Sequence, residues 1–283
     1  MEIFKLKSDL ISYLETVRSN GYKIGFTPTM GALHNGHMEL VRASKKEADC
    51  TVCSIFVNPG QFNNPEDLLN YPRSYSQDIA KLKKEECDVV YAPDEDDLYD
   101  SPNKITIGFH LGTLGTILEG KYRSGHFKGV ALVVVKLFNT IQPHFTYFGQ
   151  KDLQQYYLVR NLIRDLSYNI QLRLIPTVRE KDGLALSSRN RRIPGEMRPL
   201  ATIFFTSLTK SRDMLHRGSS VEEVKKYVEY SFKGKPELSL EYFEVVDTER
   251  FMLVDRVRDK NNTALCIAGY INNIRLIDNV MYI

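Results

Sequence analysis

Short apolar runs alternate with amphipathic segments along residues 1–176 of the chain. The apolar runs are rich in β-branched residues, which predicts buried strands, and a parallel sheet with helices on its faces produces this alternation. The predicted strands are 23–27, 51–57, 88–91, 145–148 and 170–176, and the predicted helices are 36–48, 76–86, 129–141 and 152–166. We therefore expect an α/β fold with a mostly parallel sheet in this part of the chain.

Past residue 176 the alternation gives way to helices followed by strands. This order is typical of an α+β unit. The predicted helices are 197–216 and 221–232, and the predicted strands are 240–246, 263–268 and 274–277. We expect two directly packed domains with a boundary near residue 176, the second domain being the smaller one.

Charge and apolar run length argue against two classes of partner. The formal net charge is only +3, from 38 basic and 35 acidic side chains. Proteins that depend on contacts with nucleic-acid phosphates usually carry a larger and clustered basic excess. The N-terminal segment has no apolar signal sequence, and no apolar run approaches the ~18 residues of a membrane span. We expect no nucleic acid, no membrane and a cytoplasmic location.

Cys50 and Cys53 form a C-x-x-C pair, the spacing of some redox sites. Both belong to a β-branched run that predicts a buried strand. Residues three apart on a strand face opposite ways, so the two sulfurs would not meet. We interpret these cysteines as ordinary core residues.

The most informative segment is 26–37 (FTPTMGALHNGH), which joins the first predicted strand to the first predicted helix. A helix that begins there offers unpaired N–H groups and a positive dipole end to phosphates. His34 and His37 project to one side of the helix start, and Gly36 lets a flat base or ribose approach the backbone. Two such donors suit adenylyl transfer, because negative charge builds on the phosphoryl oxygens. Helix capping and a zinc site are the alternatives, although no third zinc ligand stands nearby.

Further segments place polar groups at strand or loop ends. Asn58 and Gln61 follow the strand 51–57, and the Gln61 amide suits a hydroxy acid. In 148–155 (FGQKDLQQ), Lys151 can neutralise phosphate and Asp152 can bind ribose or cap a helix. In 179–190 (REKDGLALSSRN), two hydroxyls and a guanidinium suit a triphosphate clamp. Each segment alone could also be an ordinary turn or cap.

The segment 119–130 (EGKYRSGHFKGV) is rich in glycine and charge. This composition predicts a mobile loop near phosphates. An ion pair between Glu119 and Arg123 is expected to order the loop, which is a structural role.

In order and content, these segments together with 66–73 resemble the pantothenate synthetase family. That family belongs to a nucleotidyltransferase superfamily that also includes class I aminoacyl-tRNA synthetases. The string 28–37 (PTMGALHNGH) is the most specific part, and the resemblance covers about residues 26–190. Ser124 stands where proline is usual and Leu186 where methionine is usual. Residues 187–189 (SSR) stand in place of the lysine-containing phosphate loop of class I synthetases.

The resemblance implies a Rossmann-like domain over 1–176 that binds nucleotide and pantoate, and a smaller C-terminal α+β domain over 177–283 that forms a lid over the site. The residues implied to be catalytic are His34, His37, Lys151, Ser187, Ser188 and Arg189. Those implied to bind ATP are Met30, Gly31, His34, Gly36, His37, Gly149, Lys151, Asp152, Val178, Leu186, Ser187, Ser188 and Arg189. Those implied to bind pantoate and β-alanine are Pro28, Thr29, Asn58, Gln61 and Gln155.

The implied reaction is an ATP-dependent ligation in two steps. The pantoate carboxylate attacks the α-phosphate of ATP, giving pantoyl adenylate and pyrophosphate. The β-alanine amine then attacks the acyl carbon and releases AMP and pantothenate. Mg²⁺ is expected on the β- and γ-phosphates, held mainly by ATP itself. A homodimer is also implied by the resemblance.

Two other functions would share the histidine motif. A nucleotidyltransferase acting on a phosphorylated acceptor would want an extra basic cluster. A tRNA-binding synthetase fragment would carry a basic anticodon-reading appendage, which neither the length nor the charge indicates.

Overall fold

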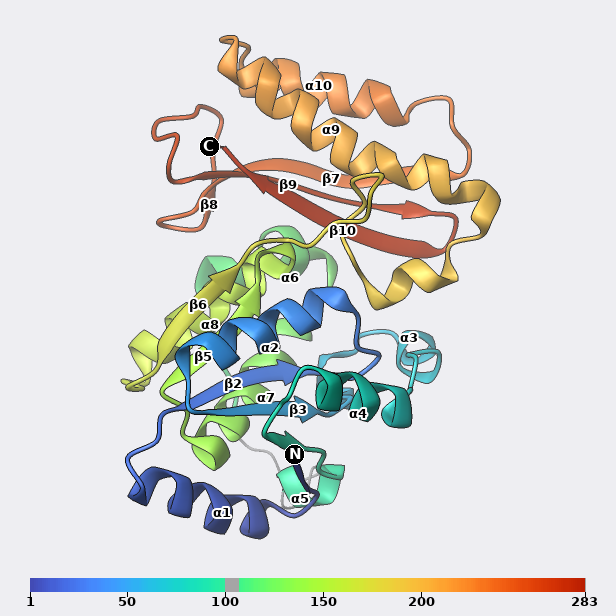
Figure 1. The fold of residues 1–283 in the computed structure, drawn as a ribbon. Coiled ribbons are helices and arrows are strands. Elements are labelled where there is room, and N and C mark those ends of the chain that lie inside the picture. The colour runs from blue at the N-terminus through green and yellow to red at the C-terminus, as the bar shows by residue number, and fades with distance from the viewer. Residues whose placement is uncertain (100–106, 283) are drawn as a thin grey trace.

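The first part of the chain forms a six-stranded, all-parallel sheet (Figure 1). The computed structural model describes residues 1–99 and 107–282, so 100–106 and 283, which the two predicted domain ranges include, lie outside the described residues. The strand order is β1-β4-β3-β2-β5-β6. The strands are β1 (Glu2–Phe4), β2 (Ile24–Thr29), β3 (Cys50–Ile55), β4 (Val89–Tyr91), β5 (Phe145–Gly149) and β6 (Gln171–Ile175). From β2 the chain adds β3 and then β4 on one side, and it later adds β5 and β6 on the other side of β2. The direction in which strands are added therefore reverses between β2 and β5.

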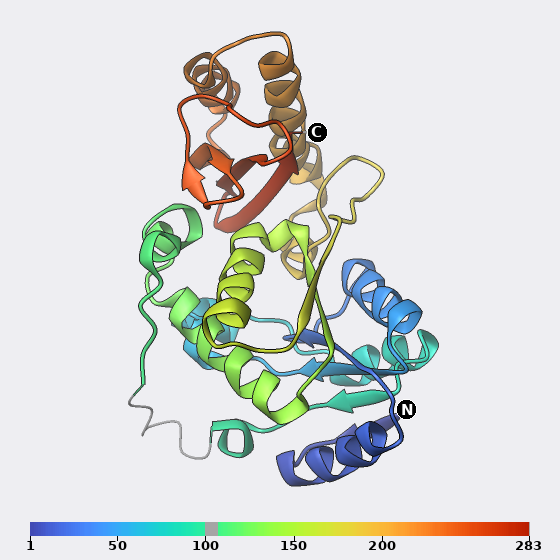
Figure 2. The ribbon, with the colours of Figure 1, turned by 90° about the vertical axis from the view of Figure 1, so that its left-hand side faces the viewer.

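Helices cover both faces of this sheet (Figure 2). The large core on one face takes side chains from α1 (Lys7–Ser19), α7 (His126–Ile141) and α8 (Leu153–Asp165). A smaller core on the other face takes side chains from α2 (Asn35–Glu47) and α4 (Tyr75–Lys84). The shorter helices are α3 (Pro65–Leu69), α5 (Glu95–Tyr99) and α6 (Leu118–Tyr122).

The cysteines lie inside these cores. Cys50 belongs to the large core and Cys53 to the smaller one, so they point to opposite faces of β3. All four cysteines are buried and free. The prediction that Cys50 and Cys53 are core residues is confirmed.

The second part of the chain is a four-stranded antiparallel sheet with two helices on one face (Figures 1 and 2). The strand order is β10-β9-β7-β8. The elements are α9 (Arg198–His216), α10 (Val221–Phe232), β7 (Leu238–Asp247), β8 (Met252–Leu253), β9 (Thr263–Ile271) and β10 (Ile274–Met281). Tyr242 and Cys266, on the face away from α9 and α10, join the large core of the first part. The two parts therefore share packed apolar side chains.

The fold class predicted from the sequence is confirmed: a Rossmann-like parallel sheet is followed by a smaller antiparallel one. The hydrophobic pattern did not predict β1, α1 or β8. Within residues 1–99 and 107–282, none of the helices combines the length and the apolarity that crossing a membrane requires.

Candidate active site

The turn between β2 and α2 places the two histidines of the 26–37 segment at the start of α2. His34 is the N-cap residue, and its Nδ1 accepts a hydrogen bond from the Gly36 backbone N–H at 3.2 Å. The His34 backbone N–H in turn donates to His37 Nδ1 at 3.2 Å. Buried Asp78 holds the preceding turn, accepting from the backbone N–H groups of Ala32 and Leu33 at 2.8 Å each. The histidines are thus both helix caps and candidate ligand contacts.

These caps fix the protonation pattern of both rings. Each Nδ1 accepts from a backbone N–H, so the neutral ring carries its proton on Nε2. Burial, the neighbouring His37 and Lys151 lower the pKa of His34 to about 2. Burial followed by Lys151 and Lys81 lowers the pKa of His37 to about 4. Near neutral pH the pair therefore consists of two uncharged Nε2–H donors, with ring centroids 4.0 Å apart.

Gly36 serves the cap as well as any ligand. A Cβ at this position would lie 2.9 Å from two atoms of the His34 ring. A larger residue would therefore push His34 out of its capping position, which sequence reasoning did not anticipate. Gly31, by contrast, lies in the turn and donates its N–H to Thr29 Oγ1 at 3.2 Å.

The turn after β5 presents the second group of predicted residues. The 3₁₀ turn Gln150–Asp152 leads directly into α8 and carries Lys151, whose Nζ lies 3.6 Å from Asp152 Oδ1. Because the strand order reverses between β2 and β5, this turn and the histidine turn flank the crevice where such sheets bind ligands. The reversal of strand order between β2 and β5 thus places two motifs that are far apart in the sequence on either side of one crevice.

The third group comes from the segment after β6. Arg179 and Ala185 form an antiparallel bridge, and the Leu186 N–H donates to the Val178 carbonyl at 2.9 Å. Ser187 then caps the short 3₁₀ helix Ser188–Arg192, its hydroxyl accepting from the Arg189 N–H at 3.2 Å. The paired backbone projects residues 187–189 toward the first sheet.

Asn58 and Gln61 lie close together after β3. The Asn58 amide donates to Gln61 Oε1 at 3.0 Å and accepts from the Tyr99 hydroxyl at 2.7 Å. The Gln61 amide donates to Met30 Sδ at 3.0 Å, which is a weak bond. A Cβ on Gly129 of α7 would lie 2.0 Å from the Gly60 carbonyl oxygen, so only glycine lets α7 approach this turn. Asn58 therefore orients Gln61, whose amide keeps donor capacity for a ligand.

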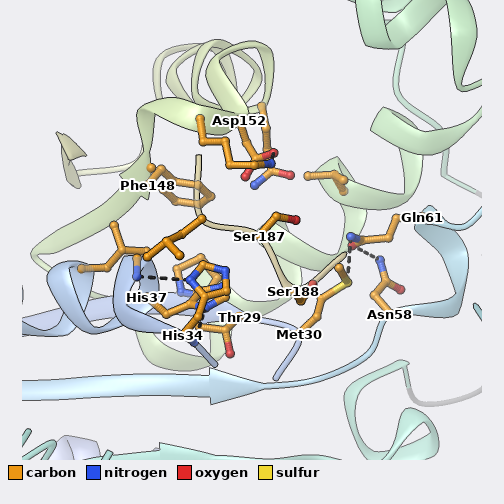
Figure 3. A pocket seen from close by; sticks show the side chains of 18 of the residues that line it. Thr29, Met30, His34, His37, Asn58, Gln61, Phe148, Asp152, Ser187 and Ser188 are labelled. Carbon is orange, nitrogen blue, oxygen red and sulfur yellow. Dashed lines mark hydrogen bonds and ion pairs between the residues drawn. The ribbon is translucent and has the colours of Figure 1, made fainter. Parts of the chain in front are cut away.

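These segments border a single cavity of about 220 Å³ (Figure 3). Every residue predicted to belong to the site lines it except Gly31. In Figure 3, His34 and His37 lie to one side, Asn58 and Gln61 to the other, and Ser187 between them. The imidazoles thus border one side of the space and the amides the other.

Sequence reasoning missed several lining residues. Thr177 has a buried hydroxyl without a hydrogen-bond partner among the described residues, and no sequence signal marks it. His126 is buried, with Nδ1 2.7 Å from the Gln61 carbonyl oxygen and Nε2 3.0 Å from Arg123 Nη1. Arg123 can only donate, so His126 carries its proton on Nδ1. Burial followed by Arg123 lowers the pKa of His126 to about 4. The sequence signal that could have identified His126 is its place within the glycine-rich segment 119–130.

The 119–130 segment, expected to be a mobile loop, forms α6 and the first turns of α7. The predicted ion pair is present, with Arg123 Nη1 3.6 Å from Glu119 Oε2. Glu119 has closer partners, however, in Arg275 and Tyr242 of the second sheet. Within the described residues, no group of three or more His, Cys, Asp or Glu side chains could hold a metal ion.

Comparison with known proteins gives the family. The sequence model described as Pantoate-beta-alanine ligase matches residues 2–281. The chain belongs to this family. Among pantoate–β-alanine ligase relatives, the pantothenate synthetase of Porphyromonas gingivalis is 41% identical over 282 residues, covering 100% of this chain and 99% of the relative. That of Azobacteroides pseudotrichonymphae is 42% identical over 283 residues, covering 100% of both chains.

Solved structures of the pantoate–β-alanine ligase family match the fold over the whole chain. Pantothenate synthetase from Thermus thermophilus superposes with a TM-score of 0.92 at 36% identity, covering 100% of this chain and 99% of the other. The ligase from Francisella tularensis, complexed with β-γ ATP and β-alanine, has a TM-score of 0.78 at 34% identity, covering 100% and 98%. The family membership supports ligation over transfer of a nucleotide to a phosphorylated acceptor.

Proposed function

We propose that this chain joins pantoate to β-alanine with ATP, and that it does so through a pantoyl adenylate. The observation that carries the proposal is the shared cavity, where His34, His37, Lys151 and the segment 187–189 border the same space. ATP use is supported by the Francisella tularensis ligase, which was solved with β-γ ATP and β-alanine. Hydrogen-bond donors and cations converging from three segments suit a polyphosphate.

In the first step, the Nε2–H groups of His34 and His37 donate to the α-phosphate oxygens. Negative charge grows there as the pantoate carboxylate attacks, so donors fixed in advance stabilise the transition state. The attacking carboxylate carries no proton to remove, and pyrophosphate leaves as an anion. The lowered pKa of about 4 keeps His37 uncharged near neutral pH, which favours it as a hydrogen-bond donor over a role as proton donor. Lys151, Ser187, Ser188 and Arg189 hold the phosphates.

On the amide side of the cavity Gln61 holds pantoate, together with Gln155, which also lines the cavity. Asn58 acts through Gln61, because its own amide is already bonded to Gln61, Gly129 and Tyr99. In the second step the β-alanine amine attacks the acyl carbon of the adenylate, and the bond from that carbon to the phosphate oxygen breaks. AMP and pantothenate are the products.

Magnesium fits this site as an ion carried by ATP. Among the described residues that line the cavity, Asp152 supplies the only carboxylate, and Mg²⁺ prefers oxygen ligands while keeping several waters. Asp152 would hold the ion together with the phosphates, and the ion would neutralise part of their charge. We extend the proposal to closure of residues 177–283 over the site as a lid, and, from the family resemblance alone, to a cytoplasmic homodimer.

The order of product release tests the proposal. With ATP and pantoate alone, we expect a burst of pyrophosphate that is stoichiometric with enzyme, and no AMP. Adding β-alanine should then release AMP and pantothenate. Pyrophosphate release that requires β-alanine, or AMP release without pantoate, would contradict the adenylate intermediate.

A further inference from the structure

The side chain of Asn279, on β10 of the second sheet, is bonded to the turn that carries Lys151. Its Nδ2 donates to the carbonyl oxygens of Gln150 and Lys151, both at 2.9 Å. Its Oδ1 accepts from Gln150 Nε2 at 3.2 Å. Asn279 is only 3% exposed, so these bonds lie out of competition with bulk water. The whole amide is thus used to hold one short turn of the first domain.

Arg179 forms hydrogen bonds with β10 at Asp278 and Asn279. Asp278, 4% exposed, accepts from Arg179 Nη1 at 2.6 Å and from Arg179 Nη2 at 3.0 Å. Arg179 Nη2 also donates to the Asn279 carbonyl oxygen at 3.0 Å. Arg179 begins the bridged segment that leads to residues 187–189. Residues 278–279 of β10 are therefore hydrogen-bonded both to the turn that carries Lys151 and to Arg179, at the start of the segment that leads to residues 187–189. Both segments are proposed to hold phosphate.

We propose that Asn279 is a positioning residue for adenylation, which sets the Lys151 turn at the distance from the histidines that ATP requires. The proposal rests on the proposed function, because it assumes that Lys151 contacts the phosphates. Asn279 is not among the residues that line the cavity. Its effect passes through the backbone of residues 150–151.

The chemistry of the side chain explains why asparagine stands there. Two carbonyl oxygens need two N–H donors, and the side-chain amide offers both from one nitrogen. Aspartate would place a carboxylate against the same two oxygens, and alanine would remove all three bonds. A displacement of about 1 Å at a site that binds a reacting group is enough to cost ~10²-fold in rate.

The test is a double-mutant cycle between Asn279→Ala and Lys151→Ala, with pre-steady-state adenylation as the readout. We expect Asn279→Ala to lower kcat/KM for ATP by about 10–100-fold while leaving KM for β-alanine unchanged. In the Lys151→Ala background the same change should reduce the rate by less than about threefold, because coupled residues are not additive. Asn261→Ala, at an exposed asparagine that does not line the cavity, serves as the matched control.

The outcomes separate this inference from the function beneath it. If Lys151→Ala alone leaves adenylation intact, the phosphate role of Lys151 fails and this inference with it, while adenylation itself stands. If the wild-type protein releases no pyrophosphate from ATP and pantoate, the proposed function fails. If Lys151→Ala has its effect but Asn279→Ala multiplies the loss in full, or has no effect alone, only the positioning role is overturned. Should Asn279→Ala not fold, Gln150→Ala removes one of the three bonds at a partly exposed site. It should then raise KM for ATP without changing KM for β-alanine, and an unchanged KM for ATP would overturn the inference.

Discussion

Glu119 on α6 and Arg275 on β10 form a bidentate ion pair, with both nitrogen–oxygen distances at 2.7 Å. The Tyr242 hydroxyl donates to the same carboxylate at 2.9 Å. Arg275 also pairs with Glu241 on β7. Glu119 is 6% exposed, so a charged group from the first sheet domain is satisfied almost entirely by the second. Through Arg123 and His126 the same cluster reaches Gln61 in the cavity.

Replacing Glu119 by glutamine should lower the free energy of unfolding by about 3 kcal/mol. Removing one partner of a buried pair leaves the other charge uncompensated, which costs ~3–5 kcal/mol, and Glu241 offsets part of that loss for Arg275. Urea denaturation of the purified variant measures the change. Glu222→Gln is the matched control, since its pair with Lys226 is solvent-exposed, and we expect its stability to be unchanged. Equal losses in the two variants would show that burial contributes nothing to the Glu119 cluster.

The same carboxylate should make stability depend on pH in the acid range. Burial alone raises its pKa, but the bonds to Arg275 and the charge of Arg123 outweigh burial and lower the pKa of Glu119 from 4.5 to about 2. A group whose folded pKa is depressed contributes stability above its unfolded pKa and loses it as pH falls toward the folded pKa. The difference in unfolding free energy between the wild type and Glu119→Gln should therefore be constant above about pH 5 and shrink between about pH 4.5 and pH 2. A difference that stayed constant down to pH 2 would contradict the lowered pKa.

His34 combines two roles that one substitution can separate. In His34→Asn, the amide oxygen can replace Nδ1 as the acceptor of the Gly36 N–H, because asparagine is a favoured N-cap. The shorter side chain cannot supply the Nε2–H donor. We expect His34→Asn to keep the wild-type stability and to lower the adenylation rate by ~10²–10³, as for loss of one transition-state donor.

His34→Ala is the companion variant, because it removes the cap as well as the donor. It should lower the rate to the same extent and also lower the unfolding free energy by about 1 kcal/mol. Single-turnover pyrophosphate release and urea denaturation give the two quantities. Near-normal adenylation in His34→Asn would leave this histidine as a cap only.

The cysteines should be silent in the native protein. Burial is the largest cause raising the pKa of each thiol, to about 11 for Cys50 and to about 12 for Cys87. The thiolate is the reactive species, and all four sulfurs are buried. We expect no modification by a thiol reagent in the folded state at about pH 7.5 and full modification in denaturant, counted by mass spectrometry. Loss of turnover in a folded variant without cysteines would contradict a mechanism that uses no covalent nucleophile.

The elements that depend on a local pattern of residues could be predicted from the sequence. Apolar runs identified β2, β3 and β5, and glycine-containing turns after them identified the segments that meet in the cavity. The short β1 and β8 escaped because two or three residues give no periodicity. Asn279 and Arg275 escaped for a different reason. Their partners in the first domain lie far away in the sequence, and only the packing of β10 against that domain brings them together.

The histidine motif shows a second limit of prediction from sequence, which concerns the roles of individual atoms. From the sequence alone, capping and ligand binding are alternatives for His34 and His37. The imidazole ring has two nitrogens, however, and the geometry assigns Nδ1 to the cap. The same holds for Gly36, whose missing side chain makes room for His34. A motif at a helix start can therefore be structural and chemical at once, because each atom of a residue has its own partner.

Substitutions at Arg189 distinguish two roles for this arginine: a charged contact to phosphate, or an anchor that holds the 187–189 segment to α3. Its Nη2 donates to Asp67 Oδ2 of α3 at 2.7 Å, with about a quarter of each side chain exposed, and it also lines the cavity. We expect Arg189→Ala to lower kcat/KM for ATP by ~10²-fold, as for loss of an electrostatic contact to the transition state. Arg189→Lys should recover only part of it, because an ammonium cannot form the bidentate contact of a guanidinium. Asp67→Asn should change kcat/KM by less than about threefold, since partly exposed ion pairs contribute ~0–1 kcal/mol. Steady-state kinetics with varied ATP decides the matter: if Asp67→Asn matched Arg189→Ala, the arginine would serve to anchor the loop to α3, and the phosphate contact would have to come from Lys151 and the two serines.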